Sequence, residues 1–220
     1  MAKIGKGVVV EFDFAVLNGA ELLFDIASGI LKKHGVDLDF RLEALHLAGG
    51  NYQGAIAELF AKVDCKADPA SVAAELNAAF NAEVAAKSAA AVTPVFRSFI
   101  AALQEKDVKV VVATRGDASA LAAAFENPDI VVHAETSSTY GSCKWDAWKR
   151  ACRLNGLHEM LTAAVTGSGF GSKAALVAGM SALGVINKRV EWQDFCGADD
   201  IVDRVDKKAA DIVLKMLKVS

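Results

Sequence analysis

The chain lacks several features that mark particular classes of protein. None of its cysteines (Cys65, Cys143, Cys152 and Cys196) are paired as CxxC, which argues against a disulfide framework and against a zinc site. Its four histidines also lack the spacing of metal ligands. Lys and Arg total 24 against 27 Asp and Glu, with no basic block or basic stripe. We therefore expect no nucleic-acid partner.

Long apolar runs are also missing. No run approaches the roughly 20 residues that a membrane-spanning helix needs, so we expect no membrane association. The first strand is expected to begin by Gly7, which leaves no room for a signal or transit peptide and favours the cytoplasm. The 220 residues are 53% hydrophobic, enough for a substantial core in one large domain or in a core with an inserted module.

Short β-branched runs alternate with helical patterns over much of the chain. The runs cover residues 7–12, 108–113, 130–133, 163–166 and 182–186. This alternation is typical of βαβ units, in which helices cover both faces of a parallel sheet. The predicted fold class is α/β, with a Rossmann-like parallel sheet. The tail from Asp200 carries apolar residues at helical spacing and is expected to pack on that sheet.

Residues 19 to about 92 interrupt the alternation because they show only helical patterns. Apolar residues recur at helical spacing in two segments, and Pro69 begins a long alanine-rich helix that ends near Ala91. Asn18-Gly19 and Thr93-Pro94 mark the two crossings between this insert and the core. We predict an α/β core formed by residues 1–17 and 93–220 and an all-helical cap formed by residues 18–92.

The first strand ends on two acids, Glu11 and Asp13, separated by one phenylalanine. Farther on, "VVVATRGD" ends a second strand on Thr114 and Arg115, and Lys144 opens a helix. This order, with a helical insert straight after the first strand, resembles the haloacid dehalogenase superfamily. More narrowly, it resembles the helical-cap branch that includes phosphoglycolate phosphatase and β-phosphoglucomutase. The resemblance covers nearly the whole chain.

The resemblance implies a role for each of these residues. Glu11 stands where the family has its aspartate nucleophile, and Asp13 where it has the general acid/base. Thr114 matches the residue whose hydroxyl holds the phosphate. Lys144 matches the lysine of the third family motif, which acts on the transferring phosphoryl group. Arg115 follows Thr114 where a small residue is usual, so it is a candidate either to bind an anion or to pair with Glu11. The catalytic candidates are thus Glu11, Asp13 and Lys144, and the ligand candidates are Thr114, Arg115 and Lys144.

Two departures from the family pattern affect the chemistry. Gly167 occupies the place of the aspartate that holds magnesium after the fourth strand, and Phe14 replaces a glycine beside the nucleophile. Magnesium usually takes one or two protein carboxylates, so we expect no metal ligand and no cofactor. A glutamate carboxylate also lies one methylene farther out than that of aspartate, where an error of about 1 Å costs roughly 100-fold in rate.

Three functions follow from this pattern. The first is a haloacid dehalogenase-like hydrolase homologue with an impaired site, retained to bind a small phosphorylated molecule or a protein partner. The second is an active phosphatase on a small phosphorylated metabolite, which would use magnesium. The third is a purely structural subunit. Each candidate also has a structural interpretation: Glu11 with Lys144 as a buried ion pair, Asp13 as a cap of the following turn, and Thr114 as an ordinary residue at a strand end.

Overall fold

The computed structural model describes residues 5–135 and 144–219, and its centre is a six-stranded parallel sheet. The strand order is β3-β2-β1-β4-β5-β6. The strands are β1 (Gly7–Glu11), β2 (Lys109–Thr114), β3 (Val131–Ala134), β4 (Thr162–Thr166), β5 (Ser181–Val185) and β6 (Asp200–Val202). Since β1 lies between β2 and β4, the carboxyl ends of these three strands meet at one edge of the sheet.

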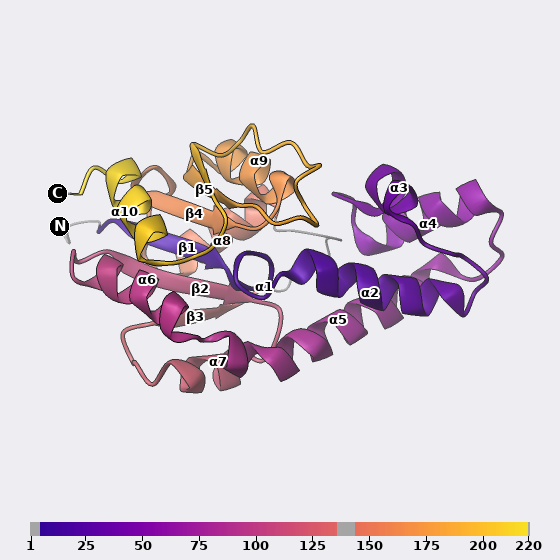
Figure 1. Ribbon diagram of the computed structural model, residues 1–220, viewed down its shortest axis with the longest axis horizontal. Coiled ribbons are helices and arrows are strands. Elements are labelled where there is room, and N and C mark those ends of the chain that lie inside the picture. Colours follow the sequence, from indigo (N-terminus) through magenta and orange to yellow (C-terminus); the bar gives the residue numbers. More distant parts are fainter. Residues whose placement is uncertain (1–4, 136–143, 220) are drawn as a thin grey trace.

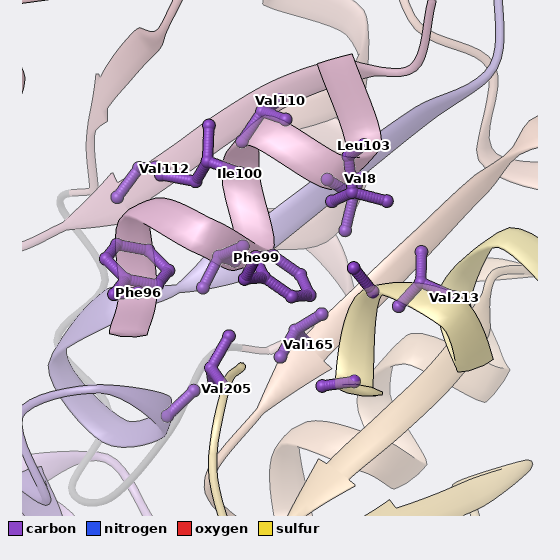
Figure 2. Packing of buried hydrophobic residues seen from close by; sticks show 14 of the residues in the cluster. Val8, Phe96, Phe99, Ile100, Leu103, Val110, Val112, Val165, Val205 and Val213 are labelled. Atoms are coloured by element: carbon purple, nitrogen blue, oxygen red, sulfur yellow. The ribbon is translucent and has the colours of Figure 1, made fainter. Parts of the chain in front are cut away.

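Alternate residues of β1 to β5 enter two separate apolar layers. Val8 and Val10 of β1 face α6 (Pro94–Gln104) and α10 (Lys207–Met216), whereas Val9 faces α8 (Trp145–Leu154) and α9 (Gly169–Ala178). Figure 2 shows the first layer, where Phe99 of α6 and Val213 of α10 pack over Val8. Burial on both faces accounts for the nearly continuous valine and alanine runs of the strands.

The chain between β1 and β2 is helical. It comprises α1 (Phe12–Ala15), α2 (Gly19–Lys32), α3 (Phe40–Leu42), the π-helical turn η1 (Glu43–Leu47), α4 (Tyr52–Val63), α5 (Pro69–Ala91) and α6. Figure 1 shows α2 to α5 to one side of the sheet, with α1 at the junction and both chain ends at the opposite end of the molecule. The predicted α/β class with an all-helical insert is confirmed, and each predicted strand overlaps an observed one. The boundaries at residues 18 and 92 remain a prediction.

The cap has an apolar cluster of its own, formed mainly by α2, α4 and α5. Asp68 caps α5 through its carboxylate, which accepts hydrogen bonds from the N–H groups of Ala70 and Ser71, and Pro69 occupies the first turn. Phe80 of α5 lies in this cluster and contacts Phe14, which comes from the junction with the sheet. The cap cluster therefore extends to the end of β1.

The prediction of a helical tail from Asp200 is wrong at its start. Residues 200–202 form β6, which pairs with β5 in the register Leu183↔Asp200. The helix α10 begins only at Lys207, because the Asp206 carboxylate accepts a hydrogen bond from the N–H of Ala209 and caps the helix there. From that point the tail packs on the sheet, as predicted.

The α7 helix (Ala118–Phe125) and a 3-10 turn (Glu159–Leu161) complete the secondary structure of the described residues. None of the helices in these residues combines the length and the apolar character needed to cross a membrane. The cytoplasmic location remains a prediction.

Candidate functional site

Both acids of the first strand are buried at the carboxyl edge of the sheet. Glu11 is the last residue of β1, Asp13 lies in α1, and each is 3% exposed. The neighbouring strands end on threonines, Thr114 on β2 and Thr166 on β4. Each acid bonds to the threonine of a different neighbouring strand, although the two carboxylates lie near enough that the Glu11 charge adds to the rise in the pKa of Asp13.

Asp13 is held by two donors from the end of β2. The Thr114 hydroxyl donates to Asp13 Oδ1 at 2.7 Å, and the backbone N–H of Arg115 donates to Asp13 Oδ2 at 2.8 Å. Burial raises the pKa of Asp13 to about 6, although both hydrogen bonds and the Arg115 charge act to lower the pKa. Asp13 thus has a pKa suited to proton transfer near neutral pH.

Glu11 is held by the end of β4. The Thr166 hydroxyl donates to Glu11 Oε2 at 2.5 Å and accepts a hydrogen bond from the N–H of Ser168. The Thr114 hydroxyl is engaged in the same way, because it also accepts a hydrogen bond from the N–H of Gly116 at 3.0 Å. Both hydroxyls are therefore used inside the protein, and binding a phosphate would require these bonds to rearrange.

Arg115 and Phe14 cover this edge from the cap side. Arg115 is 8% exposed, and its guanidinium lies 5.5 Å from the centre of the Phe14 ring and 5.6 Å from that of Phe80. The same guanidinium donates from Nη1 to the hydroxyl of Tyr52 in α4, at 3.0 Å. Burial raises the pKa of Tyr52, and the Arg115 charge opposes that rise. Arg115 thus joins the cap to the core, since its guanidinium bonds to Tyr52 and its backbone N–H bonds to Asp13.

The structure brings Glu11, Asp13, Thr114 and Arg115 together, but it does not bury the fifth candidate with them. Lys144 is the N-cap residue of α8 and is exposed. The interpretation of Glu11 and Lys144 as a buried ion pair is therefore wrong, since an exposed ammonium keeps its hydration. A phosphate-binding role for Lys144 remains a prediction.

The residues around Gly167 do not fit a magnesium ion. A Cβ added at Gly167 would lie 2.1 Å from the carbonyl oxygen of Phe14, so the backbone of α1 occupies the space that an acid side chain would need. The backbone of Gly19 also approaches the carbonyl oxygen of Asp13, because a Cβ added at Gly19 would lie 2.4 Å from that oxygen. Among the described residues, no group of three or more His, Cys, Asp or Glu side chains could hold a metal ion. A hard divalent cation would find too few oxygen ligands here.

A small cavity lies between the cap and the core beside these residues. Its walls include Phe14, Ser168 and Phe170 from the core and Leu23 and Glu43 from the cap. Its free volume of about 20 Å³ has room for a water molecule, but not for a sugar phosphate. Glu11, Asp13, Thr114 and Arg115 are not among the residues that line this cavity.

The sequence did not predict that Thr166 contacts Glu11 or that Tyr52 contacts Arg115. Thr166 directly precedes Gly167, but its bond to Glu11 depends on β1 and β4 being neighbours, which strand order alone decides. Tyr52 is the first residue of the cap helix α4. The hydrogen bond between its hydroxyl and Arg115 depends on how the cap packs on the sheet.

Comparison with known proteins supports the fold only. No protein-family model matches this chain, and no curated protein does. Among solved structures, β-phosphoglucomutase from Clostridium difficile is similar with a TM-score of 0.71 and 13% identity, covering 98% of both chains. CbbY from Rhodobacter sphaeroides, solved with phosphate, is similar with a TM-score of 0.66 and 20% identity, covering 99% of this chain and 100% of the other.

A conserved haloacid dehalogenase-like protein of unknown function from Agrobacterium tumefaciens is also similar, with a TM-score of 0.64 and 13% identity over 96% of this chain and 99% of the other. These matches span nearly the full length of every chain compared. The protein therefore has the haloacid dehalogenase-like fold with a helical cap, which confirms the resemblance noted in the sequence at the level of fold.

Proposed function

We propose that this chain is a pseudoenzyme of the haloacid dehalogenase-like type, in which the phosphoryl-transfer site is impaired and the scaffold is retained for ligand binding or protein interaction. The observation that carries this proposal is the contact between α1 and β4. The Phe14 carbonyl lies 2.1 Å from the position of a Cβ on Gly167, so this place holds backbone instead of a metal-binding acid.

The chemistry of phosphoryl transfer supports the same conclusion. The family mechanism stabilises the charge of the transferred group mainly by electrostatic clamping, to which a metal ion contributes. Here the carboxylate in the nucleophile position is a glutamate that accepts a short hydrogen bond from Thr166. In-line attack needs reacting atoms about 3–3.5 Å apart, and the extra methylene of glutamate displaces the carboxylate from the place where an aspartate would hold it.

A cavity large enough for a small ligand lies elsewhere, beside the two linkers between core and cap. It has a volume of about 320 Å³, within the range of small-molecule sites. Phe96 and Val205 contribute apolar walls, and Asn18, Thr93 and Asn187 contribute polar groups. This cavity supports a binding role for the scaffold that does not depend on Glu11 or Asp13.

We expect no magnesium-dependent turnover of phosphate monoesters. The purified chain should hydrolyse a panel of sugar phosphates and phosphoglycolate at the background rate, with or without magnesium. No acid stands at Gly167, and among the described residues no group of three or more His, Cys, Asp or Glu side chains could hold the ion. Phosphate release is the measurement, and Asp13→Ala is the control for contaminating phosphatases. A robust rate that Asp13→Ala abolishes would contradict the proposal.

The alternative is an active phosphatase on a small phosphorylated metabolite. One observation favours it: Asp13 stands in the family acid/base position with its pKa raised to about 6. Magnesium would be the expected cofactor, but α1 would first have to move away from Gly167. A magnesium-dependent rise in melting temperature that Glu11→Gln removes would favour this alternative.

A further inference from the structure

An arginine in the core segment that follows β5 contacts the cap. Arg189 lies in this segment, and its guanidinium sits 3.6 Å from the centre of the Phe24 ring of α2 and 5.7 Å from that of Phe40 of α3. The same guanidinium forms an ion pair with Glu43 of the π-helical turn η1. One core side chain thus binds three consecutive elements of the cap.

The ion pair is largely removed from water. The side chains of Glu43 and Arg189 are 8% and 17% exposed. Burial raises the pKa of Glu43 to about 7, and the Arg189 charge opposes that rise. Each charge depends on the other for compensation, because an isolated buried charge is strongly unfavourable.

Hydrogen bonds on the core side fix the position of Arg189. Its backbone N–H donates to Asn187 Oδ1 at 2.8 Å, and its carbonyl accepts a hydrogen bond from the Trp192 indole at 2.8 Å. Trp192 also contacts the cap, edge-on to Phe40 with ring centres 5.4 Å apart. Asn187 donates from its side chain to Asn18, at the first crossing between core and cap. These bonds hold the backbone of Arg189 beside the cap.

The ion pair lies beside the small cavity between cap and core. Glu43 and Trp192 both line the small cavity between cap and core, next to Phe14 and Phe170. A ligand approaching Glu11 or Asp13 from this side would have to separate the walls of that cavity. Separating them moves Glu43 away from Arg189.

We propose that the Glu43–Arg189 ion pair holds the helical cap closed on the core, and that the cap opens by separating these two charges into water. This device controls access to the site whether or not the site retains any chemistry, so it does not rest on the proposed loss of catalysis. The Tyr52–Arg115 contact joins cap and core at a second point. In that contact the partner of the arginine is a hydroxyl group, whereas Arg189 pairs with a buried carboxylate.

Loss of one charge should open the cap, whereas loss of both charges should not. In Arg189→Met, the Glu43 carboxylate stays buried without its partner, and opening of the cap relieves the penalty by hydrating it. In the double variant Arg189→Met with Glu43→Gln, neither charge remains, so the apolar contacts should close the cap again. Replacement of a whole buried pair by neutral side chains is often close to neutral, whereas removal of one partner is strongly destabilising.

Hydrogen–deuterium exchange at pH 8, above the pKa of about 7 that burial gives Glu43 in the wild type, tests the proposal. Peptides covering residues 48–52 and 167–172 report on the interface, and a peptide covering residues 56–60 reports on the interior of the cap. In Arg189→Met we expect exchange at the interface to be at least about tenfold faster than in the wild type, with the cap interior unchanged. In the double variant we expect interface exchange within about twofold of the wild type.

Asp194→Asn is the matched control. It breaks an exposed ion pair with Lys173 within the same region of the core, with N and O 3.0 Å apart, and should leave exchange at the interface unchanged. Unchanged interface exchange in Arg189→Met would overturn the proposal. So would a double variant that stays as open as the single one, since the arginine would then act by packing alone. Faster exchange in the cap interior would also overturn it, because the cap would be unfolding instead of opening.

Discussion

Replacing Gly167 with alanine is expected to lower the free energy of unfolding by about 3 kcal/mol. The added Cβ would lie 2.1 Å from the carbonyl oxygen of Phe14 and 2.4 Å from its carbonyl carbon. Both are backbone atoms of α1, so no side-chain rotation can relieve the contact, and either α1 or the end of β4 must move. Urea denaturation of the wild type and the variant measures the loss.

Gly29→Ala is the control for this variant. Gly29 lies in α2, and a Cβ added there meets no atom within 4 Å. Alanine in a helix interior is favoured over glycine, so this variant should gain about 0.5–1 kcal/mol. A Gly167→Ala variant as stable as the wild type would show that α1 is not packed against β4 as described.

The same contact bears on attempts to restore activity. The double variant Glu11→Asp with Gly167→Asp would return both family carboxylates to the sequence. We expect it to remain inactive and to unfold more readily than the wild type, because an aspartate at position 167 meets the same Phe14 backbone as alanine does. Magnesium-dependent phosphatase activity in this double variant would show that the scaffold opens enough to hold the ion.

The stability difference between Asp13→Asn and the wild type is expected to change by up to about 3 kcal/mol between pH 4 and pH 8. Burial raises the pKa of Asp13 from 3.8 to about 6, so the folded protein binds this proton more tightly than the unfolded chain. The contribution of Asp13 to stability is therefore complete below pH 3.8 and is lost as the pH rises through 6. Asparagine does not titrate, so the free energy of unfolding of the variant increases relative to that of the wild type as the pH rises.

Denaturation of both proteins across this pH range gives the difference directly. The difference cancels the titration of groups that the substitution leaves unchanged. Asparagine also loses part of the hydrogen bonding to Thr114 and Arg115, which lowers the stability of the variant by a similar amount at every pH. A difference that stays constant from pH 4 to pH 8 would show that these hydrogen bonds offset the cost of burying the charge.

Local patterns were sufficient to locate the principal elements. The valine runs identified the central strands, since strands that are buried on both faces need apolar residues at nearly every position. Pro69 and the alanines after it marked α5 from its first residue to Ala91. The pattern failed at residues 200–202, where a three-residue edge strand is too short to show a period that differs from that of a helix.

The candidate site was only partly accessible to the same reasoning. The positions of Glu11, Asp13 and Thr114 at the ends of adjacent strands followed from motif order, and the structure brings them together. The exposure of Lys144 did not follow, because a motif specifies the order of residues along the chain and not the direction of a side chain. The contact between Arg189 and Glu43 joins residues 146 positions apart, and neither one belongs to a motif.

The sequence by itself determined the α/β class, the helical insert after the first strand and the absence of an acid at Gly167, since these depend on local pattern and residue identity. Only the tertiary structure decided that the place of this acid is filled by the Phe14 backbone, that Thr166 binds Glu11, and that Arg189 pairs with Glu43 of the cap. These contacts join distant parts of the chain, and their geometry depends on strand order and on the docking of the cap.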